Sequence, residues 1–194
     1  MDEIEAVLKK FVIAMSKLDI PYVIVGGFAV AGWGRFRATQ DVDVIMQLRE
    51  TDVPWLVRVL REGGFSFKAE DILDALRRKE HFSIFNSDSI YHVDAKGAYG
   101  KHESRTLQGR VVVGIRDYRI PISGLEDTFV NKLCFGREQD LEDALAIFIR
   151  NEDRMDEAAL VSLCREYGVL RELRTLQRKA RRAERTRRED DRHR

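Results

Sequence analysis

VIVGGFAVAGWGRFRATQDVDVIM, at residues 23–46, joins two apolar, β-branched runs through a pair of glycines. The first run ends in Gly26-Gly27 and predicts a short buried strand. The small residues of 28–33 predict a brief helix that packs closely on a sheet. The second run, 42–48, predicts another strand. A strand, a glycine turn, a short helix and a strand are therefore expected in succession.

The glycine spacing excludes two common phosphate-binding motifs. A dinucleotide-binding fingerprint needs Gly-x-Gly-x-x-Gly directly after a strand, and no window of residues 26–34 has it. A P-loop needs Lys and Ser/Thr where this chain has Trp33 and Gly34. A strand that ends in glycines and opens a helix still presents free backbone N–H groups, which bind anions. The alternative is a tight turn that needs glycine for its backbone conformation alone.

Two aspartates stand together at the start of the second strand. Side chains alternate along a strand, so Asp41 and Asp43 point to the same side. Adjacent like charges on one face of a sheet are unfavourable, and a divalent cation such as Mg²⁺ or Mn²⁺ compensates them through carboxylate oxygens. The alternative is a half-exposed strand whose outer face carries two acids.

A third acid, Asp94, lies in another apolar run at residues 90–95, where it shares a face with Ile90 and His92. The residues that alternate with them, Tyr91, Val93 and Ala95, can then face the core. Three acids on neighbouring strands could hold two divalent ions about 3.5–4 Å apart, which supports in-line phosphoryl displacement.

The rest of the chain has strand and helix patterns in an order typical of an α+β fold. Further strands are predicted at 65–68, 81–85, 111–115 and 118–122, and further helices at 2–18, 53–62, 70–79, 125–136, 138–150, 156–166 and 169–189. We expect three parts: a mixed domain at 1–124, helices packed on it at 125–170, and a basic helical or disordered tail at 171–194.

Composition describes a soluble globular protein, with 44% hydrophobic and 35% charged residues in a chain of 194. No run approaches the roughly 18 apolar residues of a membrane span, and the acidic N-terminus is unlike a signal peptide. Cys134 and Cys164 lack metal-ligand spacing and are interpreted as reduced core thiols of a cytoplasmic protein. Residues 171–194 contain eleven Lys/Arg and five Asp/Glu, a formal charge of +6, whereas the remainder carries −5.

Together these motifs resemble the nucleotidyltransferase superfamily of DNA polymerase β, and most of all its minimal and toxin-type prokaryotic members. The residues that carry the resemblance are Gly26, Gly27, Arg37, Thr39, Asp41, Asp43 and Asp94. A later segment is similar to the helical stretch of the toxin-type members, through Leu125, Glu126, Asp127, Lys132, Arg137, Asp140 and Asp143. The resemblance covers about residues 20–150. Many members have Ser in place of Gly27.

The resemblance implies a mixed, mostly antiparallel β-sheet with flanking helices and a C-terminal helical segment, with 1–124 as the catalytic domain. It implies transfer of a nucleoside monophosphate from an NTP to an acceptor hydroxyl of a protein, tRNA or small molecule, with release of pyrophosphate. Asp41, Asp43 and Asp94 would be catalytic and would bind two Mg²⁺ or Mn²⁺ ions. The NTP would be bound by Gly26, Gly27, Arg37, Thr39 and Lys132.

Some superfamily members belong to toxin–antitoxin or phage-defence systems, so a partner protein is one expectation for this chain. The arginine-rich tail suits RNA such as tRNA, because clustered cations attract polyanions. A second hypothesis is a catalytically silent module of the same fold that binds a partner protein or RNA. A third is a small phosphohydrolase that uses the same metals. The three converging carboxylates favour the enzyme over the silent module.

Overall fold

The computed structural model describes the backbone of residues 3–192 and the side chains of residues 3–183. The chain forms two compact units. The first contains the residues up to Ala29 together with Arg37–Gly124, and the second contains Val30–Phe36 together with the residues from Leu125 on.

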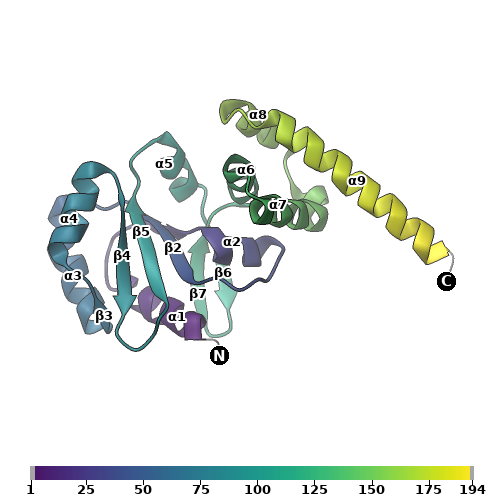
Figure 1. The fold of residues 1–194 in the computed structure, drawn as a ribbon. Helices are drawn as coiled ribbons and strands as arrows, with labels where there is room; N and C mark the ends of the chain where they lie inside the picture. The colour runs from purple at the N-terminus through teal and green to yellow at the C-terminus, as the bar shows by residue number, and fades with distance from the viewer. Residues whose placement is uncertain (1–2, 193–194) are drawn as a thin grey trace. The chain divides into compact units, whose positions relative to one another are not determined.

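The first unit is built on a seven-stranded sheet in the order β3-β4-β5-β2-β1-β7-β6 (Figure 1). The strands are β1 (Tyr22–Ile24), β2 (Asp41–Met46), β3 (Phe65–Ser66), β4 (His81–Asn86), β5 (His92–Gly97), β6 (Val111–Ile115) and β7 (Tyr118–Ile122). β2 pairs with β5 in parallel, as does β1 with β7, and the other neighbours are antiparallel. The expected mixed, mostly antiparallel sheet is confirmed.

The helices follow the expected order, with one addition. They are α1 (Glu3–Met15), α2 (Gly26–Trp33), α3 (Val53–Glu62), α4 (Ala69–Arg78), α5 (Lys101–Gln108), α6 (Leu125–Phe135), α7 (Glu138–Asn151), α8 (Glu157–Glu166) and α9 (Leu170–Arg192). Sequence patterns did not predict α5, which buries only Thr106 and Leu107 and so lacks an apolar stripe. Within the described residues, no helix is both long and apolar enough to cross a membrane.

One face of the sheet forms the core of the first unit. Val42 and Val44 of β2 and Val93 of β5 are almost fully buried on the side opposite the acids. α1 packs against β2 and β5 and touches α3, which in turn packs against α4. Phe11 of α1 meets the ring of Phe65 edge-on, with centroids 6.3 Å apart. The alternation predicted for β2 and β5 thus has its apolar half in the core.

Within the first unit, α5 covers one end of the opposite face. Ile45, two residues beyond Asp43 on β2, is buried in a small cluster with Val23 of β1 and Leu107 of α5. Asp41 and Asp43 precede this cluster along the strand and stay half-buried. α5 therefore covers the end of this face beyond the acids, whose side chains stay half-buried.

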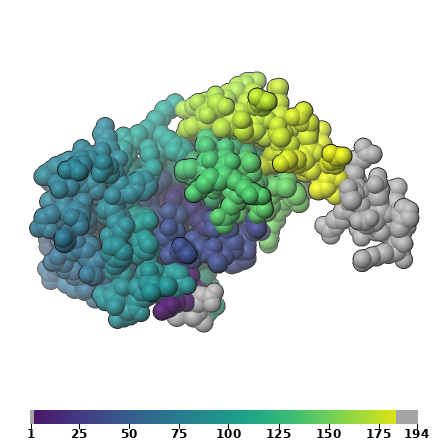
Figure 2. All heavy atoms as spheres, viewed as in Figure 1, coloured from purple at the N-terminus to yellow at the C-terminus, as the bar shows by residue number. Residues whose placement is uncertain are grey.

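The second unit has a helical core of its own. Phe129 of α6, Phe148 of α7, Leu160 of α8 and Leu173 of α9 are buried together with Val30 of α2. α9 packs against α7 and α8, so its first turns belong to this core although its composition is strongly basic. Figure 2 shows the start of α9, in yellow, on the surface next to α8.

The segment 30–36 is fixed within the second unit by α7. The side-chain amide of Asn151 donates hydrogen bonds to the carbonyls of Trp33 and, at 2.8 Å, of Ile147. A Cβ on Gly34 would lie 3.0 Å from the Cα of Ile147, so the backbones pack directly against each other.

The two cysteines are both free thiols but differ in environment. Cys164 is fully buried, and burial raises its pKa to about 12. Cys134 is exposed, so its assignment as a core thiol was wrong. It lies at the end of α6 beside Phe135, which is also exposed, on a side of the helix that the core does not cover.

Candidate active site

Asp41, Asp43 and Asp94 lie on one face of the sheet, on the neighbouring strands β2 and β5. β2 and β5 run parallel with Asp43 opposite Asp94 and Asp41 opposite His92. Because both strands alternate in step, all four side chains lie on one face. Val42 and Val93 point to the core from the positions between them.

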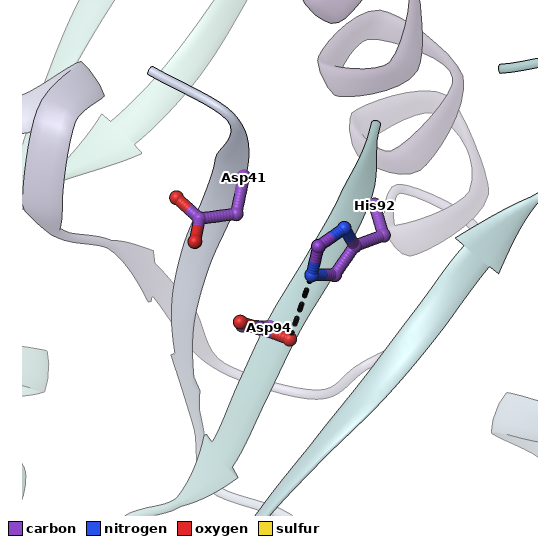
Figure 3. Close-up of side chains that lie close together, drawn as sticks. All are labelled: Asp41, His92 and Asp94. Atoms are coloured by element: carbon purple, nitrogen blue, oxygen red, sulfur yellow. Dashed lines mark ion pairs between the residues drawn. The ribbon is translucent and has the colours of Figure 1, made fainter. Parts of the chain in front are cut away.

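Asp41, His92 and Asp94 form the tightest group (Figure 3). Each offers one donor atom, and these atoms all lie within 4.8 Å of one another. The side chains of His92 and Asp94 are 26% and 30% exposed, so solvent and ligands reach them. His92 was placed on this face by strand alternation but was not included in the predicted metal site.

Asp94 is held by two neighbours through the same carboxylate oxygen. The hydroxyl of Ser83 on β4 donates a hydrogen bond of 2.6 Å to Oδ1, and Nε2 of His92 lies 3.3 Å from that oxygen. Figure 3 shows the other oxygen of Asp94 on the side of the strand that carries Asp41. One oxygen thus fixes the orientation of the carboxylate while the other faces the site. The sequence analysis did not identify Ser83 as a site residue. It lies within the strand predicted at 81–85, but no local pattern shows that this strand is next to Asp94.

Asp43 lies against the glycine turn. Gly26 has a φ of +59°, a left-handed conformation that favours glycine. A Cβ added to Gly26 would stand 1.8 Å from Oδ2 of Asp43, so this position also has no room for a side chain. Glycine is therefore required here for two reasons, and the turn and the second aspartate form one piece of structure.

Thr39 fills the space between the glycine turn and Asp41. A Cβ on Gly27 would lie 2.7 Å from Oγ1 of Thr39. The same hydroxyl lies 3.4 Å from Oδ1 of Asp41. Arg37, close by in the chain, is half-exposed and donates a hydrogen bond of 3.2 Å to the carbonyl of Ala38.

Lys132 belongs to the second unit and is engaged there by acids. It is buried, and its Nζ lies 2.8 Å from Asp140 and 3.2 Å from Asp143. Burial alone would raise the pKa of Asp140, but hydrogen bonds from Arg137 and Lys132 leave it below its usual value. Lys132 is therefore paired with two aspartates of α7, Asp140 and Asp143. Its assignment to NTP binding stays a prediction.

Solved structures with the same fold are nucleotidyltransferase-like. The solution structure of the antibiotic-resistance factor ANT(2'')-Ia matches with a TM-score of 0.58 and 13% identity over 90% of this chain and 99% of that one. A crystal structure of ANT(2'')-Ia in complex with adenylyl-2''-tobramycin matches with a TM-score of 0.55 and 12% identity, over 84% of this chain and 95% of that one. The crystal structure of an antigenic nucleotidyltransferase-like protein from Paracoccidioides brasiliensis matches with a TM-score of 0.50 and 16% identity, over 81% of this chain and 87% of that one.

These matches establish the fold. The chain has the nucleotidyltransferase fold that its glycine turn and aspartates predict. No protein-family model and no curated protein sequence matches it. The minimal or toxin-type subgroup stays a prediction.

Proposed function

We propose that the protein is a metal-dependent nucleotidyltransferase that moves a nucleoside monophosphate from an NTP to an acceptor hydroxyl. The observation that supports this best is the presence of Asp41, Asp43 and Asp94 on one half-buried face of a nucleotidyltransferase fold, with Asp43 against a glycine turn. A structural role would not require like charges on facing strands, because such pairs repel one another.

The donor atoms fit a divalent cation. Carboxylate oxygens from Asp41 and Asp94 approach within 4.8 Å of each other on a half-exposed surface, and Asp43 follows on the same face of β2. Asp41, Asp43 and Asp94 would hold Mg²⁺ or Mn²⁺, two ions in the full site. When bound, such ions neutralise charge on the phosphates and favour ionisation of a hydroxyl.

The protein groups have complementary tasks around the NTP. Backbone N–H groups at Gly26 and Gly27 would donate hydrogen bonds to the β- and γ-phosphates. Arg37 would neutralise charge on the departing pyrophosphate. Asp94, held by Ser83 through one oxygen, has its second oxygen available to accept the proton of the attacking hydroxyl. The oxygen–phosphorus bond to the acceptor forms as the bond to pyrophosphate breaks.

The proposal extends to the identity of the NTP and of the acceptor. ANT(2'')-Ia has been solved with an adenylylated tobramycin, which supports ATP as the first NTP to test and a sugar hydroxyl as one acceptor class. RNA is a second acceptor class to test, since the exposed side of α9 carries Arg171, Arg174 and Arg178. Binding of tRNA through α9 must weaken steeply as salt rises, which a titration at several salt concentrations would measure.

The decisive experiment is transfer of label from α-labelled NTPs in the presence of Mg²⁺ or Mn²⁺, with tRNA, cell extract and amino sugars as acceptors. Asp94→Asn should reduce the rate by about 10²–10⁴-fold, the usual contribution of a general base. Asp88→Asn is the matched control, because Asp88 is an exposed turn residue paired with Lys10.

Two results would separate this function from its alternatives. Release of phosphate without pyrophosphate would identify a phosphohydrolase. A protein that labels no acceptor and binds no NTP with metal, yet captures a stable partner when Asp41 and Asp43 are both replaced, would be a silent binding module. The same capture experiment would also test for a partner protein of the toxin–antitoxin kind.

A further inference from the structure

We propose that His92 is a ligand of the bound metal ion, and that the site therefore prefers Mn²⁺ or a similar transition-metal ion to Mg²⁺. This inference rests on the proposed function, because it concerns the metal of the same site. It differs from the sequence-based expectation, which assigned the metal to carboxylates alone.

The position of His92 between two carboxylates supports this role. His92 is the direct neighbour of Asp41 across the parallel β2–β5 pair, and its Nε2 lies 3.3 Å from Oδ1 of Asp94. The three donor atoms lie within 4.8 Å of one another. Ligands on opposite sides of an ion with bonds of about 2.1 Å are separated by about 4.2 Å. Small side-chain rotations would thus bring all three onto one ion.

Neighbours on β4 hold the imidazole and the carboxylate in place. The ring of Phe85 stacks on that of His92, with centroids 5.3 Å apart and planes inclined by 29°. Ser83, two residues earlier on β4, binds Asp94. Such supporting contacts orient metal ligands and reduce the entropy lost when an ion binds.

The mixed donor set determines which ion fits best. Mg²⁺ favours oxygen ligands and keeps much of its water. Imidazole nitrogen suits the later transition metals best, and Mn²⁺, although it too binds carboxylates well, is softer than Mg²⁺ and accepts an imidazole more readily. Replacing one carboxylate or water by His92 would therefore strengthen binding of Mn²⁺ more than that of Mg²⁺. The other explanation is that His92 only orients Asp94 by an ion pair, in which case its nitrogen stays off the metal.

Pulsed electron paramagnetic resonance of Mn²⁺ bound to the full-length protein, without nucleotide, distinguishes these explanations. Directly bound imidazole gives a ¹⁴N modulation. We expect it in the wild type and in His81→Gln but not in His92→Gln. His81 is a matched control, since it is an exposed histidine at the start of β4 in the same sheet.

Competition between Mn²⁺ and Mg²⁺ gives a second readout. His92→Gln should lower the preference for Mn²⁺ by about 10-fold or more, because even residues that only support a ligand change affinity by about 10–100-fold. Thermal unfolding of His92→Gln and His81→Gln confirms that both variants are folded. An unchanged preference in folded His92→Gln would overturn the proposal.

Absence of ¹⁴N modulation in the wild type, or its persistence in His92→Gln, would also overturn it. Nucleotide transfer that depends on Asp94 but occurs without ¹⁴N modulation would overturn the role of His92 and leave the proposed function intact. A ¹⁴N signal in a protein that transfers no nucleotide would support the metal site and refute the function.

Discussion

Substitution of Gly26 by alanine tests the contact between the glycine turn and Asp43. A non-glycine residue at the φ of +59° observed there costs about 1–2 kcal/mol. The new Cβ would also stand 1.8 Å from Oδ2 and 2.7 Å from Cγ of Asp43. An ordinary contact of about 3.4 Å requires the carboxylate to move by about 1.6 Å, which forces its side chain away from its preferred rotamer at about 0.5–1.5 kcal/mol.

The matched control is Gly64→Ala in the same unit. Gly64 has a φ of +83°, but no atom lies within 4 Å of a Cβ built on it. Both variants therefore bear the backbone cost, and only Gly26→Ala displaces Asp43. Urea unfolding should show Gly26→Ala less stable than Gly64→Ala by about 1 kcal/mol. Nucleotide transfer should fall about 10²-fold in Gly26→Ala alone, since a displacement near 1 Å costs about that much.

A double variant isolates the contact. In an Asp43→Ala background the colliding carboxylate is gone and only the Cβ of residue 43, 3.1 Å from the new Cβ, remains, so most of the extra stability cost of Gly26→Ala over Gly64→Ala should disappear. Equal losses for the two glycine variants in the presence of Asp43 would refute the reasoning. So would an extra loss at Gly26 that persists after Asp43 is removed.

Three further predictions concern the second unit. Lys132→Met should destabilise it by up to about 3–5 kcal/mol in urea unfolding, because Asp140 and Asp143 would lose the buried cation between them and keep only the more exposed Arg137 and Arg35; a loss below about 1 kcal/mol would contradict this. The pKa of Asp140 is lower in the folded protein, so its contribution is present above the unfolded pKa of about 4 and disappears as pH falls through the folded value. Unfolding from pH 7 to pH 3 should therefore show a flatter decline in Asp140→Asn than in the wild type, and parallel curves would argue against it. Asn151→Ala should cost about 1–3 kcal/mol because it removes the buried hydrogen bonds from this side chain to the carbonyls of Trp33 and Ile147, whereas exposed Gln139→Ala should change little.

Strand alternation made the acidic face predictable. The spacing of Asp41 and Asp43, and of His92 and Asp94, places each pair on one side of its strand whatever the rest of the chain does. That the two strands are neighbours followed only from the resemblance to a known fold. The register that sets Asp41 beside His92 depends on the pairing of β2 with β5, which no local pattern encodes.

Contacts between elements that are far apart in the chain could not be predicted from the sequence. The approach of Asp43 to Gly26 depends on how the turn passes over β2, and α5 has too few apolar residues to give a helical pattern. The resemblance assigned Lys132 to NTP binding. Its burial with Asp140 arises only when α6 and α7 pack together.

The membership of residues 30–36 in the second unit has a consequence for how this protein can be divided or recombined. These residues interrupt the first unit, so the chain crosses between units at 29–30, 36–37 and 124–125. A fragment that ended at Gly124 would leave Val30 without Phe129 and the rest of its apolar surroundings. The C-terminal helices are therefore not a module that gene fusion could exchange by one cut. Replacing these helices would also require changes in residues 30–36, between the glycine turn and Asp41.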